Sequence, residues 1–132
     1  MNNETKELLI AKAWAVRENA YSPYSGFKVG AAILCSSGEI FTGCNVENAS
    51  SGATICAERN AISAAVAAGK TKFEAIAIVA DDENIVPCGI CRQVLSEFAG
   101  DIVIICCTKN DMQQYTLSEL LPNSFTKFNI KE

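Results

Sequence analysis

The chain has 132 residues, of which 49% are hydrophobic and 20% are charged, and this predicts one compact domain spanning residues 1–132. The formal net charge of −4 and the pI of about 4.9 disfavour a polynucleotide-binding protein, because such domains usually carry clustered Lys and Arg. The polar, acidic first residues and the lack of a long apolar run predict neither a secretory signal nor a membrane span. We therefore expect a cytoplasmic protein that acts on a small uncharged molecule.

Sequence patterns predict a helix and then two strands in the first third of the chain. Residues 4–19 carry apolar side chains spaced by three and four positions, which is typical of a helix with one buried face. Turn-forming residues at 21–26 end this helix. Strands follow at 27–35 and 39–46, and the short glycine-containing connection between them predicts an antiparallel pair.

An alanine-rich helix and two strongly apolar strands are predicted next. Thr54 is expected to cap a helix over residues 55–68, and Gly69 follows it in the position that favours a left-handed residue. The apolar runs at 73–80 and 102–107 have the length of strands that are covered on both faces.

Further helices complete the predicted pattern. A helical segment at 88–98 lies between the two apolar strands, and a short helix is predicted around residues 117–121. The alternation of strand and helix from residue 39 onward indicates an α/β fold with a partly parallel sheet.

Three cysteines and one glutamate carry the clearest chemical signal, in a chain without histidine. Catalytic zinc takes three protein ligands from Cys, His and carboxylates and leaves one position for water, so a site of this type here must be all-thiolate. Cys88 and Cys91 have the two-residue gap of a zinc knuckle, and Cys56 would complete three ligands. These cysteines lie at predicted helix starts, where the peptide dipoles favour thiolates. Glu58 follows one ligand by two residues, which places an acid near the metal without binding it and predicts a role in proton transfer.

Other interpretations of the cysteines are open at this point. A structural zinc site would need a fourth ligand, which Cys35 or Cys44 could supply. The second motif also has the spacing of a thioredoxin-like redox pair, and all three cysteines could be buried small hydrophobes. Cys35, Cys44, Cys106 and Cys107 lie in predicted strands, where we expect core packing, and seven cysteines is an odd number for a disulfide framework.

Several segments, in order across nearly the whole chain, resemble the zinc-dependent cytidine deaminases of free-nucleoside metabolism. The segments are Tyr21-Ser22-Pro23-Tyr24-Ser25-Gly26-Phe27 with the five residues that follow, Asn45-Val46-Glu47-Asn48-Ala49, Cys56-Ala57-Glu58-Arg59, Pro87-Cys88-Gly89-Ile90-Cys91-Arg92-Gln93 and Leu120-Leu121-Pro122. The resemblance implies a three-layer α/β/α fold with a central mixed sheet of about five strands.

The resemblance also implies a reaction and its catalytic groups. One zinc ion per subunit would be held by the three cysteines. Glu58 would move protons between water, the pyrimidine ring and the departing amine in the hydrolytic deamination of cytidine and deoxycytidine, a step of pyrimidine salvage. Arg59 and Arg92 stand beside Glu58 and Cys91, and we expect them to donate to ligand sulfurs and offset the negative charge of three thiolates.

Substrate contacts and assembly follow from the same resemblance. Asn45 and Glu47 would bind the ribose hydroxyls, and their spacing puts both side chains on one side of an extended chain. Phe27 would pack against the base, with Ala57 also in contact with the substrate. Phe125 would reach the active site of a neighbouring subunit in a homotetramer.

Two alternative functions are weighed against this one. A deaminase of another cytosine nucleoside, such as a blasticidin-type antibiotic, would use the same chemistry, but the pair Asn45 and Glu47 favours cytidine and deoxycytidine. A non-catalytic structural zinc module would need neither Glu58 nor a ribose-binding pair. Polynucleotide editing is disfavoured by the acidic charge.

Overall fold

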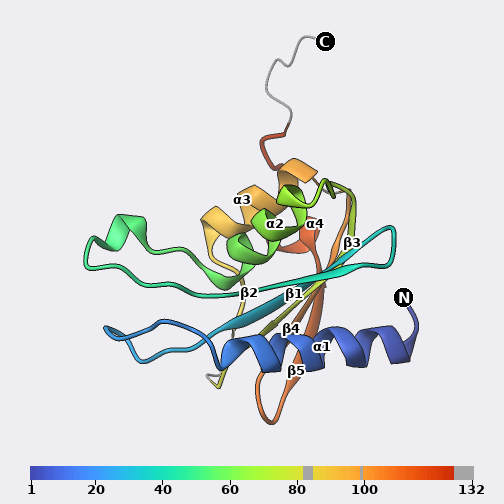
Figure 1. Cartoon of the computed structure of the whole chain (residues 1–132). Helices are drawn as coiled ribbons and strands as arrows, with labels where there is room; N and C mark the ends of the chain where they lie inside the picture. The colour runs from blue at the N-terminus through green and yellow to red at the C-terminus, as the bar shows by residue number, and fades with distance from the viewer. Residues whose placement is uncertain (82–84, 99, 127–132) are drawn as a thin grey trace.

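A five-stranded mixed sheet forms the centre of the molecule (Figure 1). The computed structural model describes residues 1–81, 85–98 and 100–126. The strand order is β2-β1-β3-β4-β5; β3 and β4 run parallel, and the other neighbours are antiparallel. The strands are β1 (Gly30–Cys35), β2 (Ile40–Cys44), β3 (Phe73–Val79), β4 (Val103–Cys107) and β5 (Met112–Thr116). The predicted antiparallel pair and the predicted mixed sheet are both confirmed.

Helices cover both faces of this sheet and give three layers (Figure 1). One long helix packs on one face, and two packed helices lie on the other. The helices are α1 (Asn3–Arg17) on the first face, α2 (Ala57–Ala67) and α3 (Gly89–Phe98) on the second, and two short elements, η1 (Ser51–Ala53) and α4 (Leu117–Leu120). Among the helices of the described residues, none has the length and apolar character needed to cross a bilayer.

The α1 side of the sheet is held by a compact apolar cluster. Leu9 and Ala13 are buried against β1 and β3, as the helical spacing predicts. Trp14 is half-buried at the border of this cluster, and the guanidinium of Arg17 lies 5.5 Å from its ring centroid. This helix therefore stabilises the sheet from the side opposite α2 and α3.

The start of α2 is fixed by a close approach to β2. A Cβ atom at Gly43 would lie 2.4 Å from the backbone nitrogen of Ala61 and 2.7 Å from the carbonyl oxygen of Ala57. Only glycine permits this contact, because both neighbours are backbone atoms that cannot turn aside. The first turn of α2, which carries Glu58, is thus placed directly over the edge of the sheet.

The sequence misplaced one helix start and missed one strand. Thr54 does not cap α2, because the helix begins at Ala57 with Cys56 as its N-cap in extended conformation. The Thr54 hydroxyl instead accepts a hydrogen bond from the Asn48 amide at 3.2 Å. Strand β5 was not located from the sequence, because its residues are polar and mostly exposed and show no apolar run.

Candidate metal centre and active site

Three cysteine sulfurs meet between the starts of α2 and α3. The Sγ atoms of Cys56, Cys88 and Cys91 all lie within 4.8 Å of one another. Cys56 and Cys88 are 3.8 Å apart, and Cys88 and Cys91 are 3.4 Å apart. A tetrahedral zinc with Zn–S bonds of about 2.3 Å requires sulfurs about 3.8 Å apart, so the donor type and the spacing fit zinc.

No fourth ligand of a structural zinc site accompanies this cluster. Within the described ranges, no other His, Cys, Asp or Glu joins the three cysteines. Cys35 is buried in β1, and Cys44 lies in β2 with intermediate exposure. The cluster therefore offers three protein ligands and leaves a coordination position for water, which is the pattern of a catalytic site.

Local structure brings the sulfurs together. Cys56 is extended, with φ of −70° and ψ of 155°, immediately before α2. Cys88 precedes α3 and Cys91 lies in its first turn, where the amide of Arg92 donates to the Cys88 carbonyl oxygen at 3.0 Å. Two helix N-termini thus face the cluster, and their positive partial charges favour thiolates there.

The three thiols also hydrogen-bond to one another. The bond with Cys91 lowers the pKa of Cys56 to about 5, and Arg59 and Cys88 add to this shift. The same bond, together with burial, raises the pKa of Cys91. One sulfur is therefore readily ionised near neutral pH, as metal binding requires.

Glu58 is a buried carboxyl beside the sulfur cluster. Its side chain is 5% exposed and lies in the first turn of α2. Burial raises the pKa of Glu58 to about 7, and the negative charge of Cys56 adds to the effect. A carboxyl that changes protonation near pH 7 is suited to general acid–base work.

The two arginines near the ligands occupy different places. One terminal nitrogen of Arg59 lies 3.7 Å from Cys56 Sγ and 3.2 Å from the Thr54 carbonyl oxygen. Arg92 instead donates to the carbonyl oxygens of Pro87 and Leu120, at 2.8 and 2.9 Å. Arg92 thus ties the segment before Cys88 to α4, which differs from the predicted donation to sulfur.

A pocket of about 200 Å³ opens beside Glu58 and the sulfurs. It brings together six of the residues singled out in the sequence, namely Phe27, Asn45, Cys56, Ala57, Glu58 and Cys88. Five further lining residues were not among the predicted site residues, namely Val29, Thr54, Ile78, Ile85 and Val86. Four of these are apolar side chains whose type gives no sign of a pocket. The wall therefore joins polar and sulfur groups to an apolar surface, as small-molecule sites do.

The predicted ribose-binding pair makes many contacts with the backbone around Phe27. Asn45 is 8% exposed; its side-chain oxygen accepts from the Val29 amide at 2.9 Å, and its side-chain nitrogen donates to the Phe27 carbonyl oxygen at 2.8 Å. Glu47 does not line the pocket, and its carboxylate accepts from the backbone amides of Tyr24 and Ser25.

Phe125 lies outside the pocket wall. Its ring is 59% exposed, and its carbonyl oxygen accepts a hydrogen bond of 2.7 Å from the side chain of Gln93. Sequence reasoning did not assign Gln93 a role, although it is the last residue of the second cysteine segment, Pro87–Gln93. The bond joins the segment that carries Phe125 to helix α3.

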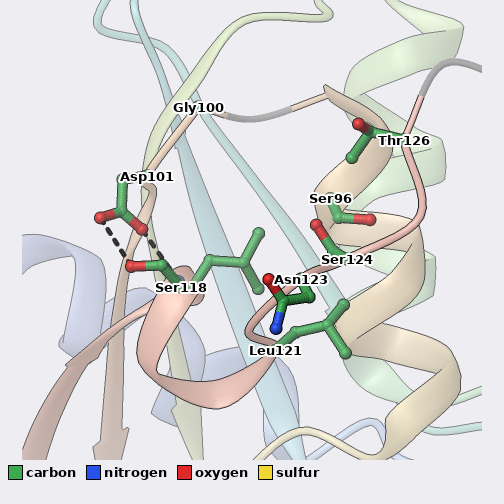
Figure 2. Close-up of a pocket in the computed structure, with 9 residues that line it drawn as sticks. Ser96, Gly100, Asp101, Ser118, Leu121, Asn123, Ser124 and Thr126 are labelled. Carbon is green, nitrogen blue, oxygen red and sulfur yellow. Dashed lines mark hydrogen bonds between the residues drawn. The ribbon is translucent and has the colours of Figure 1, made fainter.

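A second hollow, shown in Figure 2, is larger but contains none of the predicted site residues. Its volume is about 340 Å³, and it lies against α3, α4 and the segment after α4. Its carboxylate, Asp101, accepts hydrogen bonds of 2.9 Å from the amide and the hydroxyl of Ser118. Chemistry, not size, therefore identifies the pocket beside Glu58 as the candidate active site.

Comparison with known proteins agrees with this assignment. A model of the cytidine and deoxycytidylate deaminase zinc-binding region matches residues 3–107. A cytidine deaminase from Sporosarcina psychrophila is 48% identical over 124 residues, covering 92% of this chain and 91% of the relative. The crystal structure of cytidine deaminase from Burkholderia pseudomallei superposes with a TM-score of 0.86 at 44% identity, covering 95% of this chain and 100% of that one.

A relative with a different substrate in its name is also found. Blasticidin-S deaminase from Bacillus cereus is 32% identical over 108 residues, covering 75% of this chain and 77% of the relative. The match over most of the chain and the three-cysteine cluster lead to one conclusion: this chain belongs to the cytidine and deoxycytidylate deaminase family. The resemblance drawn from the sequence motifs is confirmed at the level of the family.

Proposed function

We propose that this chain catalyses the hydrolytic deamination of cytidine and deoxycytidine. Water adds at C4 of the cytosine ring, ammonia leaves, and uridine or deoxyuridine is the product. The observation that carries the proposal is the pocket in which a carboxyl with a raised pKa and two sulfurs of a three-cysteine cluster share one wall with Phe27. Family membership and the similarity to cytidine deaminases support the choice of substrate.

One zinc ion per chain would be held by Cys56, Cys88 and Cys91, whose sulfur separations suit it. Zinc bound there supplies the activation of water for attack near neutral pH. Arg59, which lies near the Cys56 sulfur, offsets part of the negative charge of the thiolates.

Glu58 is the proton-transfer group of this proposal. Its burial keeps the carboxyl protonated to unusually high pH, so it can both take and release a proton under neutral conditions. It would accept one proton from the attacking water and deliver it to N3 of the ring; it would then take the remaining proton from the new C4 hydroxyl and pass it to the amine, which leaves as ammonia. Glu58 lines the pocket together with Cys56 and Cys88, which supports its assignment to these transfers.

Binding of the nucleoside is assigned to the remaining pocket groups. Phe27 would pack on the base, and the first helical residue Ala57, whose N–H lacks an intrahelical partner, would bind a polar ring atom. Asn45 and Glu47 would bind the ribose hydroxyls with the hydrogen-bonding capacity that their backbone contacts leave free.

Assembly and location complete the proposal. We infer a homotetramer in which Phe125 reaches a neighbouring active site, as the resemblance implies; the 59% exposure of Phe125 is compatible with such a contact. Free cysteines throughout the described residues agree with a reducing cytoplasm, where the reaction would serve pyrimidine salvage.

The alternative is deamination of a blasticidin-type antibiotic, which the blasticidin-S deaminase relative favours. The pair Asn45 and Glu47, which is assigned to the ribose hydroxyls, favours cytidine instead. Purified protein should be incubated with cytidine, deoxycytidine, deoxycytidylate, cytosine and blasticidin S, and ammonia release measured for each. We expect kcat/KM to be highest for the two nucleosides. A higher value for blasticidin S would support the alternative, and zinc binding without any deamination would refute both.

A further inference from the structure

The peptide groups on both sides of Phe27 are held by side chains of other residues. The Phe27 amide donates to the Ser25 hydroxyl at 3.0 Å, and the Phe27 carbonyl oxygen accepts from the Asn45 side chain at 2.8 Å. The Val29 amide then donates to the same Asn45 side chain at 2.9 Å. Asn45 thus continues the pairing of the two strands beyond Gly30, where β1 begins.

The Ser25 hydroxyl connects this arrangement to Glu47. Ser25 donates to one carboxylate oxygen of Glu47, while the amides of Tyr24 and Ser25 donate to the other oxygen at 2.9 and 3.1 Å. The Phe27 amide therefore bonds to a hydroxyl that is itself polarised by a carboxylate. Such a chain is stronger than an isolated neutral bond.

These hydrogen bonds are needed because packing alone does not fix Phe27. The residue is 37% exposed and lies outside the regular strand. It follows Gly26, whose φ of +71° is a conformation that glycine adopts at little cost and that marks a sharp turn. A ring at a pocket wall in such a segment takes its position from the polar contacts of its own backbone.

We propose that Ser25 is a positioning residue of this enzyme. Its hydroxyl links the Glu47 carboxylate to the Phe27 amide and so holds the Phe27 ring at the place where the base packs. The inference rests on the proposed function for the role of Phe27. It adds a residue that does not line the pocket.

The kinetic test compares the variants Ser25→Ala, Ser25→Thr and Ser22→Ala with cytidine as substrate. The Ser22 hydroxyl makes no hydrogen bond in the part of the chain that the structure describes, so Ser22→Ala is a matched control in the same turn. Ser25→Ala removes two hydrogen bonds of the hydroxyl, the one from the Phe27 amide and the one to Glu47. Because Phe27 would bind the ground state and the transition state alike, the loss should raise KM about three- to tenfold with little change in kcat. Ser25→Thr keeps a hydroxyl, so its KM should stay close to that of the wild type.

A double-mutant cycle shows whether Ser25 acts through Phe27. In a Phe27→Ala background, Ser25→Ala should raise KM by a clearly smaller factor than in the wild type, because the ring that it positions is gone and only its bond to Glu47 is lost. An equal rise of KM in both backgrounds, or an unchanged KM in Ser25→Ala alone, would overturn the proposal.

A measurement without substrate separates this inference from the proposed function. Exchange of the Phe27 amide hydrogen, followed by NMR, should become at least about tenfold faster in Ser25→Ala and stay unchanged in Ser22→Ala. If the wild type fails to deaminate cytosine nucleosides, the proposed function fails, and this exchange rate still decides whether Ser25 holds Phe27. An unchanged rate would overturn the contact itself.

Discussion

Replacing Glu58 with glutamine in protein stripped of metal removes a buried ionisable group and nearly preserves the shape of the side chain. The pKa of Glu58 is about 7 in the folded chain, against an ordinary value of 4.5, chiefly because of burial. Below pH 4.5 the carboxyl is neutral in both the folded and the unfolded chain, and burial carries no ionisation cost. As the pH rises from 4.5 to 7, the carboxyl ionises in the unfolded chain but stays protonated in the folded chain. Ionisation therefore lowers the free energy of the unfolded chain alone, and the wild type loses stability until the pH has passed 7.

The size of this loss follows from the two pKa values. The gap between 7 and 4.5, at about 1.36 kcal/mol per pH unit, corresponds to about 3 kcal/mol. The substituted glutamine side chain cannot ionise, so the free energy of unfolding of Glu58→Gln relative to the wild type should rise by about 3 kcal/mol between pH 4.5 and pH 8.

Urea denaturation with a reductant and a chelator, at several pH values from 4.5 to 8, measures this difference directly. The ionisation of the cysteines affects both proteins and cancels in the comparison, except for its coupling to the Glu58 carboxylate. Stability curves that run parallel across the whole range would show that Glu58 has an ordinary pKa and would refute the reasoning from burial.

Three further predictions concern packing, the metal and its surroundings. Gly43→Ala should lower the free energy of unfolding by about 1–3 kcal/mol in thermal or urea denaturation, because its Cβ would lie 2.4 Å from a backbone atom. The control is Gly52→Ala, whose Cβ meets nothing within 4 Å and which should have little effect. Equal losses in the two variants would contradict the close packing of α2 on β2. Removing zinc with a chelator should lower the midpoint of thermal unfolding, and free zinc at about 1,000 times its dissociation constant should return about 4 kcal/mol; Cys91→Ser should show a much smaller return. Arg59→Gln should lower kcat by a larger factor than it lowers the zinc content, which is measured by atomic absorption. The reason is that Arg59 offsets the charge of the sulfurs without binding the metal. An unchanged kcat in a fully metallated variant would refute this.

The metal centre could be predicted because its residue types leave few choices. Without histidine, a zinc site of this type was predicted to use thiolates, the motif spacing singled out three of the seven cysteines, and the structure brings those three sulfurs together. The carboxyl two residues after Cys56 also lies where the motif predicts, at the pocket wall. The residue types and spacing of such short motifs can be seen in a single sequence, and they are enough to predict the kind of site.

The parts that were not predicted depend on contacts between distant segments. Strand β5 gains its place by pairing with β4 and shows no apolar pattern of its own. Helix α2 begins at Ala57 and packs closely on Gly43 in β2, a contact between distant segments that the residue types around Thr54 do not reveal. The bonds of Asn45 and Glu47 to the turn before β1 likewise arise only when the two segments meet.

The most direct test of the central claim is the rate of uridine formation from cytidine by the wild type and by Glu58→Gln, both shown to carry one zinc ion per chain. The account predicts conversion by the wild type and a loss of at least about 100-fold in kcat for the metallated variant, because the proton-transfer group is gone while the metal ligands remain. Equal rates for the two metallated proteins would contradict the role of Glu58, and a wild type that leaves cytidine unchanged would contradict the proposed reaction.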